Sequence, residues 1–140
     1  MDGGKVYVDS SVVLRRLLEQ PGAIKDWSAW SGAVASELTQ LEALRTLDRL
    51  RVLDKLTASE LADCLEELSL WTSSFEQVPI DRSVVRRASA PLPTPLGALD
   101  ALHLATALLW MENNLEELTI VTHDRQLATA ARASGLEVRT

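Results

Sequence analysis

The sequence predicts an α/β protein with three layers, in which helices cover both faces of a central, mostly parallel sheet. Two observations predict this fold class. Short runs of β-branched or small residues alternate with helical patterns along the chain, which is typical of parallel sheets. The 140 residues, 46% of them hydrophobic, are enough for one substantial core but too few for two ordinary domains. We therefore expect a single domain over 1–140.

The expected strands are short and are bounded by turn residues or by acids. The third strand contains Pro79, which has no N–H to donate, so we expect this strand at an edge of the sheet. The predicted strands cover 5–8, 31–35, 77–80, 118–122 and 136–139.

The helices are predicted from apolar residues at helical spacing and from residues that favour helix ends. Thr57 and Glu60 have the spacing of a capping box, and Gly135 is suited to end the last helix. Cys64 is the only cysteine and lies in a helical pattern, so we interpret it as a small core residue. The predicted helices cover 12–18, 37–51, 58–71, 82–88, 97–108 and 125–134.

The helix over 97–108 carries the most unusual residue of the sequence. This helix is apolar nearly all round, so it is expected to be buried on most sides, yet its first turn contains Asp100. A buried Asp is rare unless a cation, a metal or hydrogen-bond donors compensate its charge. The rest of the chain should therefore supply this compensation, or further acids for a shared site.

Three further acids can reach the same edge of the sheet. Asp9 and Asp124 each follow a predicted strand, and the carboxyl ends of parallel strands meet at one edge, where open sheets bind ligands. Glu42 borders the apolar stripe of its helix. Two structural alternatives stay open: Asp9 can cap the helix that follows it, and Glu42 can pair with Arg45 on its own helix.

Four carboxylates that converge repel one another and raise their own pKa values unless hard cations lie between them. Ligation by oxygen alone, with no Cys nearby and few His, favours Mg²⁺ or Mn²⁺ over Zn²⁺. Such a site is suited to phosphodiester hydrolysis, in which a metal activates water. The candidate acids are Asp9, Glu42, Asp100 and Asp124.

The acids occur in motifs with a definite order: Val-Asp-Ser-Ser at 8–11, Ser36 to Glu42 with Arg45, Leu-Asp-Ala-Leu-His-Leu-Ala-Thr-Ala at 99–107, and Thr-His-Asp at 122–124. In this order the chain resembles the PIN-domain ribonucleases over essentially its whole length, and it is most similar to VapC-type toxins of bacterial toxin–antitoxin operons. The resemblance implies a PIN-like fold, the same four acids as catalytic metal ligands, and polar support from Thr122 or Ser10.

The resemblance also implies a function. It implies Mg²⁺ or Mn²⁺ as cofactor, cleavage of RNA, a homodimer, and a cognate antitoxin that blocks the site. Arg45 at the rim and His123 beside Asp124 are the candidates for contact with RNA. His103, in a strongly apolar helix, is expected to be a core imidazole with one hydrogen bond.

At two positions the match between this sequence and the pattern of the family is not straightforward. Glu37 competes with Glu42 for the second acid position, and Glu42 is preferred because it precedes Arg45 and lies further along the helix. Gln126 stands where many relatives have an additional acid, so a lower metal affinity or a water ligand is expected there. The alternative function is a catalytically weak or inactive PIN-like domain that binds other proteins.

The net charge and the absence of certain motifs argue against several other classes of protein. The net charge of -6 argues against non-specific binding of polyanions by the molecule as a whole, although eleven of the fourteen basic residues are Arg, which suit local phosphate contacts. A receiver domain needs a late Lys that is absent, and a dinucleotide-binding module needs a glycine-rich turn after the first strand. No apolar run approaches the roughly 18 residues of a membrane span, and no signal peptide precedes the first strand, so a cytoplasmic protein is expected.

Overall fold

The computed structural model describes residues 4–140, and these residues form one parallel sheet with helices on both sides. The strand order is β3-β2-β1-β4-β5, so the first strand of the chain lies in the middle of the sheet. The strands are β1 (Lys5–Val8), β2 (Gly32–Ser36), β3 (Glu76–Val78), β4 (Thr119–Val121) and β5 (Glu137–Arg139). The predicted three-layer α/β fold is confirmed. β3 is an edge strand, as predicted, and it ends directly before Pro79.

The helices agree with the predicted ones except at some of their ends. They are α1 (Ser10–Leu17), α2 (Glu37–Val52), α3 (Ala58–Ser74), α4 (Arg82–Ser89), α5 (Ala98–Asn114) and α6 (Arg125–Ala133). The capping box before α3 is present, because Thr57 and Glu60 accept hydrogen bonds from each other's backbone N–H groups. α5 continues past the predicted end at residue 108 and stops where Leu115 adopts a left-handed backbone, with φ 52°. Its last turn is polar, so the apolar pattern ended earlier than the helix.

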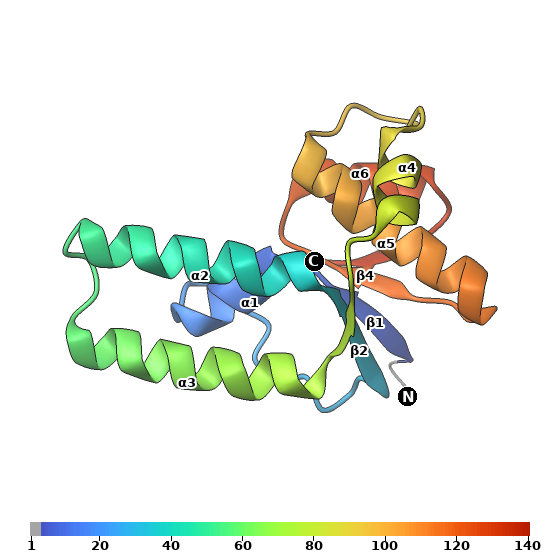
Figure 1. The fold of residues 1–140 in the computed structure, drawn as a ribbon. Coiled ribbons are helices and arrows are strands. Elements are labelled where there is room, and N and C mark those ends of the chain that lie inside the picture. The colour runs from blue at the N-terminus through green and yellow to red at the C-terminus, as the bar shows by residue number, and fades with distance from the viewer. Residues whose placement is uncertain (1–3) are drawn as a thin grey trace.

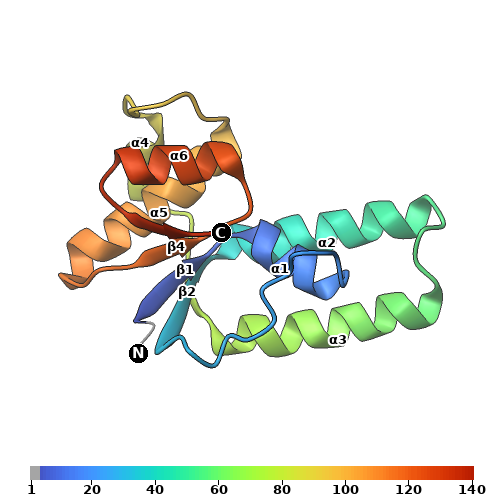
Figure 2. The same ribbon diagram turned by 180° about the vertical axis from the view of Figure 1, so that it is seen from behind.

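The helices form two groups beside the sheet (Figure 1). α2 and α3 are a long antiparallel pair that extends away from the sheet, and α1 packs against both of them. α5 packs against α4 and α6 on the other side, and the view from behind in Figure 2 shows the same division.

Two apolar cores correspond to these two groups. Alternate residues of β1 point to opposite faces of the sheet, so Val6 and Val8 enter one core while Tyr7 enters the other. The first core includes Leu47 of α2 and the second includes Leu104 of α5, both fully buried. Burial of a side chain of this size contributes about 1.5–3 kcal/mol to stability. β1 is thus fixed from both faces at the point where it leads into Asp9.

An aromatic cluster anchors α1 against α3. The Trp27 ring stacks on Trp30 with centroids 5.3 Å apart and contacts the Trp71 ring edge-on at 5.1 Å. The Arg16 guanidinium lies 4.2 Å from the Trp27 ring centre, a favourable cation–π distance. Cys64 is buried in the same core, which confirms its structural interpretation. In the described part of the chain, no helix has the length and apolar character that crossing a membrane requires.

Candidate carboxylate site

The candidate site lies at the carboxyl ends of the two central strands. Asp9 follows β1 directly, and Thr122, His123 and Asp124 follow β4, which pairs with β1. The Asp9 N–H donates a hydrogen bond of 3.1 Å to the carbonyl of Val121, so the ends of the two strands are joined. The predicted meeting of Asp9 and Asp124 at one edge of the sheet agrees with this geometry.

Asp9 is held by hydroxyl groups and is only 3% exposed. Its Oδ2 accepts hydrogen bonds from Ser11 Oγ at 2.7 Å and from Thr122 Oγ1 at 2.8 Å. Asp9 occupies the N-cap position of α1, but its side chain makes no capping hydrogen bond. The capping alternative is therefore wrong for this residue, and its carboxylate is oriented towards the site.

Asp124 caps α6 with one carboxylate oxygen and, among residues 4–140, leaves the other free at the candidate site. Its Oδ1 accepts from the N–H of Leu127 at 2.9 Å and caps α6. Its own N–H donates to Thr122 Oγ1 at 3.0 Å. Oδ2 makes no hydrogen bond to any residue within 4–140 and remains able to bind a ligand. Thr122, which is fully buried, thus links both acids through its hydroxyl.

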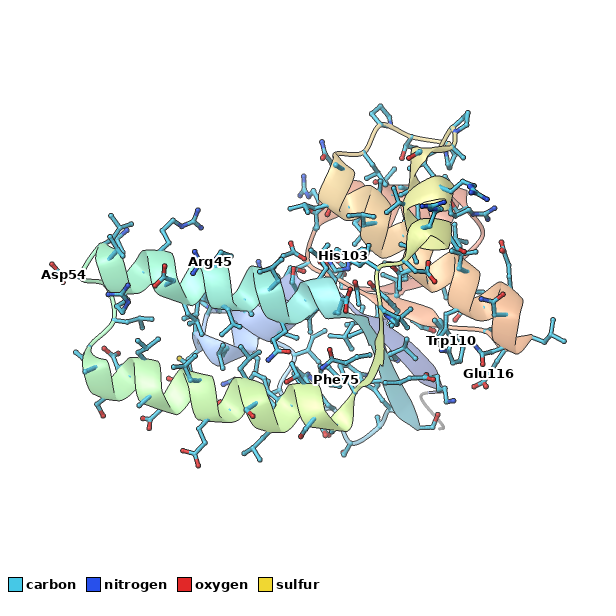
Figure 3. The ribbon with its side chains drawn as sticks, viewed as in Figure 1. Arg45, Asp54, Phe75, His103, Trp110 and Glu116 are labelled. Atoms are coloured by element: carbon cyan, nitrogen blue, oxygen red, sulfur yellow. The ribbon has the colours of Figure 1, made fainter. Side chains whose placement is uncertain are left out.

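His103, labelled in Figure 3, connects the acids to the core. Its Nε2 lies 2.6 Å from Glu42 Oε1 and 3.5 Å from Asp9 Oδ1, and its Nδ1 lies 2.7 Å from the Tyr7 hydroxyl. The ring is 1% exposed. It is buried as predicted, but the prediction of one hydrogen bond is wrong, because both ring nitrogens are bonded and one of them holds a candidate acid.

The electrostatic balance around His103 favours its charged form. Burial lowers the pKa of His103, but the hydrogen bond to Glu42 and the negative charges of Asp9 and Glu42 outweigh burial and raise it above the usual value. Burial and the charge of Asp9 raise the pKa of Tyr7 well above its ordinary value, so its hydroxyl stays protonated. Tyr7 and His103 together hold Glu42 at the edge of the site.

Asp100 lies near enough to the other three acids for their charges to affect its pKa. Its pKa is raised to about 6, first by burial and then by the negative charges of Asp124, Asp9 and Glu42, while His103 acts in the opposite direction. These carboxylates are close enough to repel Asp100, which agrees with the predicted convergence. Asp100 is half-buried and lies in the first turn of α5.

Glu42 and Glu37 have different surroundings, which supports the choice of Glu42. The Glu37 carboxylate accepts a hydrogen bond from the Ile80 N–H at 2.8 Å and so ties α2 to the segment after β3. Glu42 is 23% exposed and bonds to His103 instead.

Two predicted contacts differ in the structure. Arg45 binds Asp48 Oδ2 at 3.1 Å rather than Glu42, is 68% exposed, and lies further along α2 from His103 (Figure 3). The structural alternative for Glu42, a pair with Arg45, is therefore wrong. Ser10 is buried but makes no side-chain hydrogen bond to residues 4–140, and the neighbouring Ser11 binds Asp9 in its place.

Ser11 is the residue that sequence reasoning missed. Its Oγ also accepts from the N–H of His123 at 2.9 Å, so it joins the start of α1 to the loop after β4. The Asp-Ser-Ser order offered two hydroxyls, and only the register of α1 decides which of them faces Asp9.

The donor set has the chemistry of a hard-cation site, although its present arrangement is not that of a bound metal. Carboxylate and hydroxyl oxygens dominate, as Mg²⁺ and Mn²⁺ prefer. Within residues 4–140, no three His, Cys, Asp or Glu side chains are arranged to hold one ion, and Glu42 is directed to His103. The pKa of Asp100 is nevertheless raised, first by burial and then by the negative charges of neighbouring acids, and a cation would relieve that second effect.

The fold and the site define an α/β domain with a parallel sheet and a cluster of acids at its carboxyl edge. The family model of the PIN domain matches residues 6–133. The chain therefore belongs to the PIN domain family, whose members are in general nucleases.

Solved structures of the same fold cover 96% of the chain. A toxin–antitoxin complex from Klebsiella pneumoniae is 18% identical, with TM-score 0.64 over 96% of that chain. VapBC-5 from Mycobacterium tuberculosis, a member of the VapBC family of toxin–antitoxin systems, is 21% identical, with TM-score 0.60 over 96% of that chain. FitAB bound to an IR36 DNA fragment is 17% identical, with TM-score 0.67 over 93% of that chain. No curated protein matches the chain.

Proposed function

We propose that this protein is a divalent-metal-dependent endoribonuclease that acts as the toxin of a toxin–antitoxin pair. The observation that carries the proposal is the gathering of acids at the carboxyl edge of the sheet, where burial first, and then the charges of Asp124, Asp9 and Glu42, raise the pKa of Asp100 to about 6. The imidazole of His103 offsets part of this negative charge, and a divalent cation would offset the rest. Membership of the PIN domain family and the similarity to solved toxin–antitoxin proteins support the same function.

The metal is Mg²⁺ or Mn²⁺ in this proposal, held by Asp9, Asp100 and Asp124, with Glu42 directly or through water. A bound cation of this kind supplies charge stabilisation at the scissile phosphate and lowers the pKa of a water molecule. The protein's own part is orientation. Thr122 fixes Asp9 and Asp124 relative to each other, while His103 holds Glu42.

The substrate and partners follow from the same proposal. RNA would approach along the rim beside His123, while Arg45 contributes only at a distance, since it pairs with Asp48. Gln126 would leave one ligand position to water. A cognate antitoxin would cover the site and a second copy of the chain would complete a homodimer, both acting in the cytoplasm.

The test is RNA cleavage by purified protein with Mn²⁺, for the wild type and for Asp9→Asn and Asp100→Asn. Each variant should lose at least about a hundredfold in rate, a loss of ~2.7 kcal/mol of transition-state stabilisation. Asp63→Asn, which changes an exposed acid on α3, is the matched control and should cleave like the wild type. Cleavage retained by both site variants would contradict the proposal.

A second candidate function is a PIN-like module that binds proteins without catalysis. The hydrogen bond that directs Glu42 to His103 favours it, because Oε1 of this acid is then bonded to an imidazole, and no three acidic or His/Cys side chains of residues 4–140 are arranged around one ion. Calorimetric titration with Mn²⁺ separates the two functions. A binding module would give no signal that depends on Asp100, whereas a nuclease would lose its signal in Asp100→Asn.

A further inference from the structure

A pocket of about 620 Å³ lies beside the carboxylate site, between α1 and α6. Its wall includes Arg15 of α1 and Arg125 and Arg132 of α6. His123 and Asp124 belong to both the pocket and the edge of the carboxylate site. We call this feature the arginine pocket.

One face of α6 builds the floor of the arginine pocket. Arg125, Ala128, Thr129 and Arg132 all line it, and they recur at the spacing of one helix face. The two residues between the arginines are small, so a ligand can lie between the two guanidinium groups. Thr129 adds a hydroxyl that already donates to the carbonyl of Arg125 at 3.0 Å and can still accept a hydrogen bond.

Arg15 completes the pocket from the opposite wall. The backbone of Gly22 lies against its guanidinium, because a Cβ at Gly22, where φ is +81°, would be 3.7 Å from Arg15 Nη1. None of the three pocket arginines forms an ion pair within the part of the chain that the structure describes, whereas Arg45, Arg51 and Arg87 do.

His123 lies where the arginine pocket adjoins the carboxylate site. Its Nε2 is buried and has no hydrogen-bond partner within residues 4–140. A buried polar atom without a partner costs about 1–3 kcal/mol, so native structures rarely contain one without a reason. Among residues 4–140, Asp124 is the only acidic side chain on the wall, and its Oδ1 is already bonded to the N–H of Leu127.

We propose that the arginine pocket binds a phosphate group of an RNA strand that also reaches the carboxylate site. Guanidinium groups present paired N–H donors that match two phosphate oxygens, and three of them here face a ligand-sized space. The pocket adjoins the site through His123 and Asp124, so one strand can contact both. This inference rests on the proposed function for the identity of the strand, but not for the phosphate chemistry.

The three pocket arginines also reduce the electrostatic repulsion between this acidic protein and RNA. The protein carries a net charge of -6, and the site acids repel a polyanion. A local group of three unpaired guanidiniums beside those acids attracts the backbone and sets its register.

The test measures binding of a fluorescent single-stranded RNA by anisotropy, in chelator so that no cleavage occurs. Arg15→Gln and Arg132→Gln should each weaken binding about tenfold at low salt. Each should also lower the slope of log affinity against log salt by about 0.7, the value for one contact to a single strand. Arg86→Gln is the matched control, because Arg86 also lies exposed in the last turn of a helix and does not line the pocket. Inorganic phosphate should compete with the RNA for the wild type, and glutamate at equal concentration should not.

The outcomes separate this inference from the proposed nuclease activity. If the pocket variants bind RNA like Arg86→Gln, the inference is wrong even where the wild type cleaves RNA. If they lose RNA binding while the wild type never cleaves, the pocket stands and the nuclease proposal fails. Competition by glutamate, together with unchanged RNA affinity of Arg15→Gln and Arg132→Gln, would assign the pocket to a carboxylate of a protein partner and overturn the inference.

Discussion

The Tyr7 hydroxyl lies 2.7 Å from His103 Nδ1, so a strand in the middle of the sheet holds the imidazole that binds Glu42. Both residues are fully buried, and neither faces solvent at the site. The position of one candidate catalytic acid thus depends on a hydrogen bond inside the second core. This relationship can be tested without knowledge of the substrate.

Tyr7→Phe should destabilise the protein by about 1–3 kcal/mol, because His103 Nδ1 would lose its partner in a buried position. The ring itself still fits, so the change removes only the hydroxyl. Denaturation in urea measures the effect. An unchanged midpoint would mean that the imidazole finds another partner and that Tyr7 does not position it.

Asp100→Asn should raise stability at pH 7 when metal is absent. Because the pKa of Asp100 is raised from 3.8 to about 6, the folded protein binds more protons than the unfolded chain between these values. Wild-type stability therefore falls as pH rises through this range, and Asn at this position removes the effect. The advantage of Asp100→Asn in melting temperature should be small near pH 4 and full above about pH 6. A lower melting temperature than the wild type at pH 7 would indicate a structural role for Asp100.

Asp48→Asn is a control in which we expect the melting temperature at pH 7 to change in the opposite direction. The hydrogen bond from Arg51 is the main cause that lowers the pKa of Asp48. The ionised Asp48 therefore stabilises the folded protein at neutral pH, and this stabilisation is lost as pH falls through the lowered pKa. Asp48→Asn should melt slightly below the wild type at pH 7, with a difference that vanishes in acid.

Mn²⁺ should stabilise the wild type by mass action, by about 2.7 kcal/mol at a hundred times the dissociation constant. Asp100→Asn should be stabilised much less, since it lacks one ligand and part of the negative charge. Thermal melting with chelator and with millimolar Mn²⁺ measures both proteins, and Asp63→Asn should respond like the wild type. If Mn²⁺ shifts neither the wild type nor Asp63→Asn, the acids do not form a metal site.

Thr122→Val should reduce both stability and cleavage. Val has nearly the shape of Thr, but it lacks the hydroxyl that donates to Asp9 and accepts from the Asp124 N–H. Loss of these buried bonds should cost about 1–3 kcal/mol, and the freed Asp9 should lower the cleavage rate. Thr72→Val is the matched control, because its buried hydroxyl donates only to carbonyls of its own helix, α3. Equal cleavage by the two variants would contradict the orienting role of Thr122.

Much of the fold could be predicted from the sequence because its signals are local. The β-branched run at 118–122 and the capping box at Thr57 depend on neighbouring residues alone, and both agree with the structure. The extent of α5 could not be predicted in the same way. Its last turn packs little apolar surface, so no periodic pattern marks where it ends.

Of the candidate site, only the positions of the acids that directly follow strands could be predicted from the sequence. Asp9 and Asp124 were found because residues after parallel strands share one edge. Side-chain partners were not predictable, since they depend on packing between elements. Arg45 has an acid three residues away on each side, and it pairs with Asp48 because Glu42 is held by His103 from another helix.

The strand order has a consequence for the synthesis of this protein. β1 lies between β2 and β4, so the carboxyl edge is incomplete until the chain has been made past residue 124. Asp9 and the Thr122 hydroxyl that holds it are separated by 113 positions. A nascent chain that ends before β4 has an open central strand and no assembled cluster of acids. Any activity of this site therefore begins only after the chain has left the ribosome as far as residue 124.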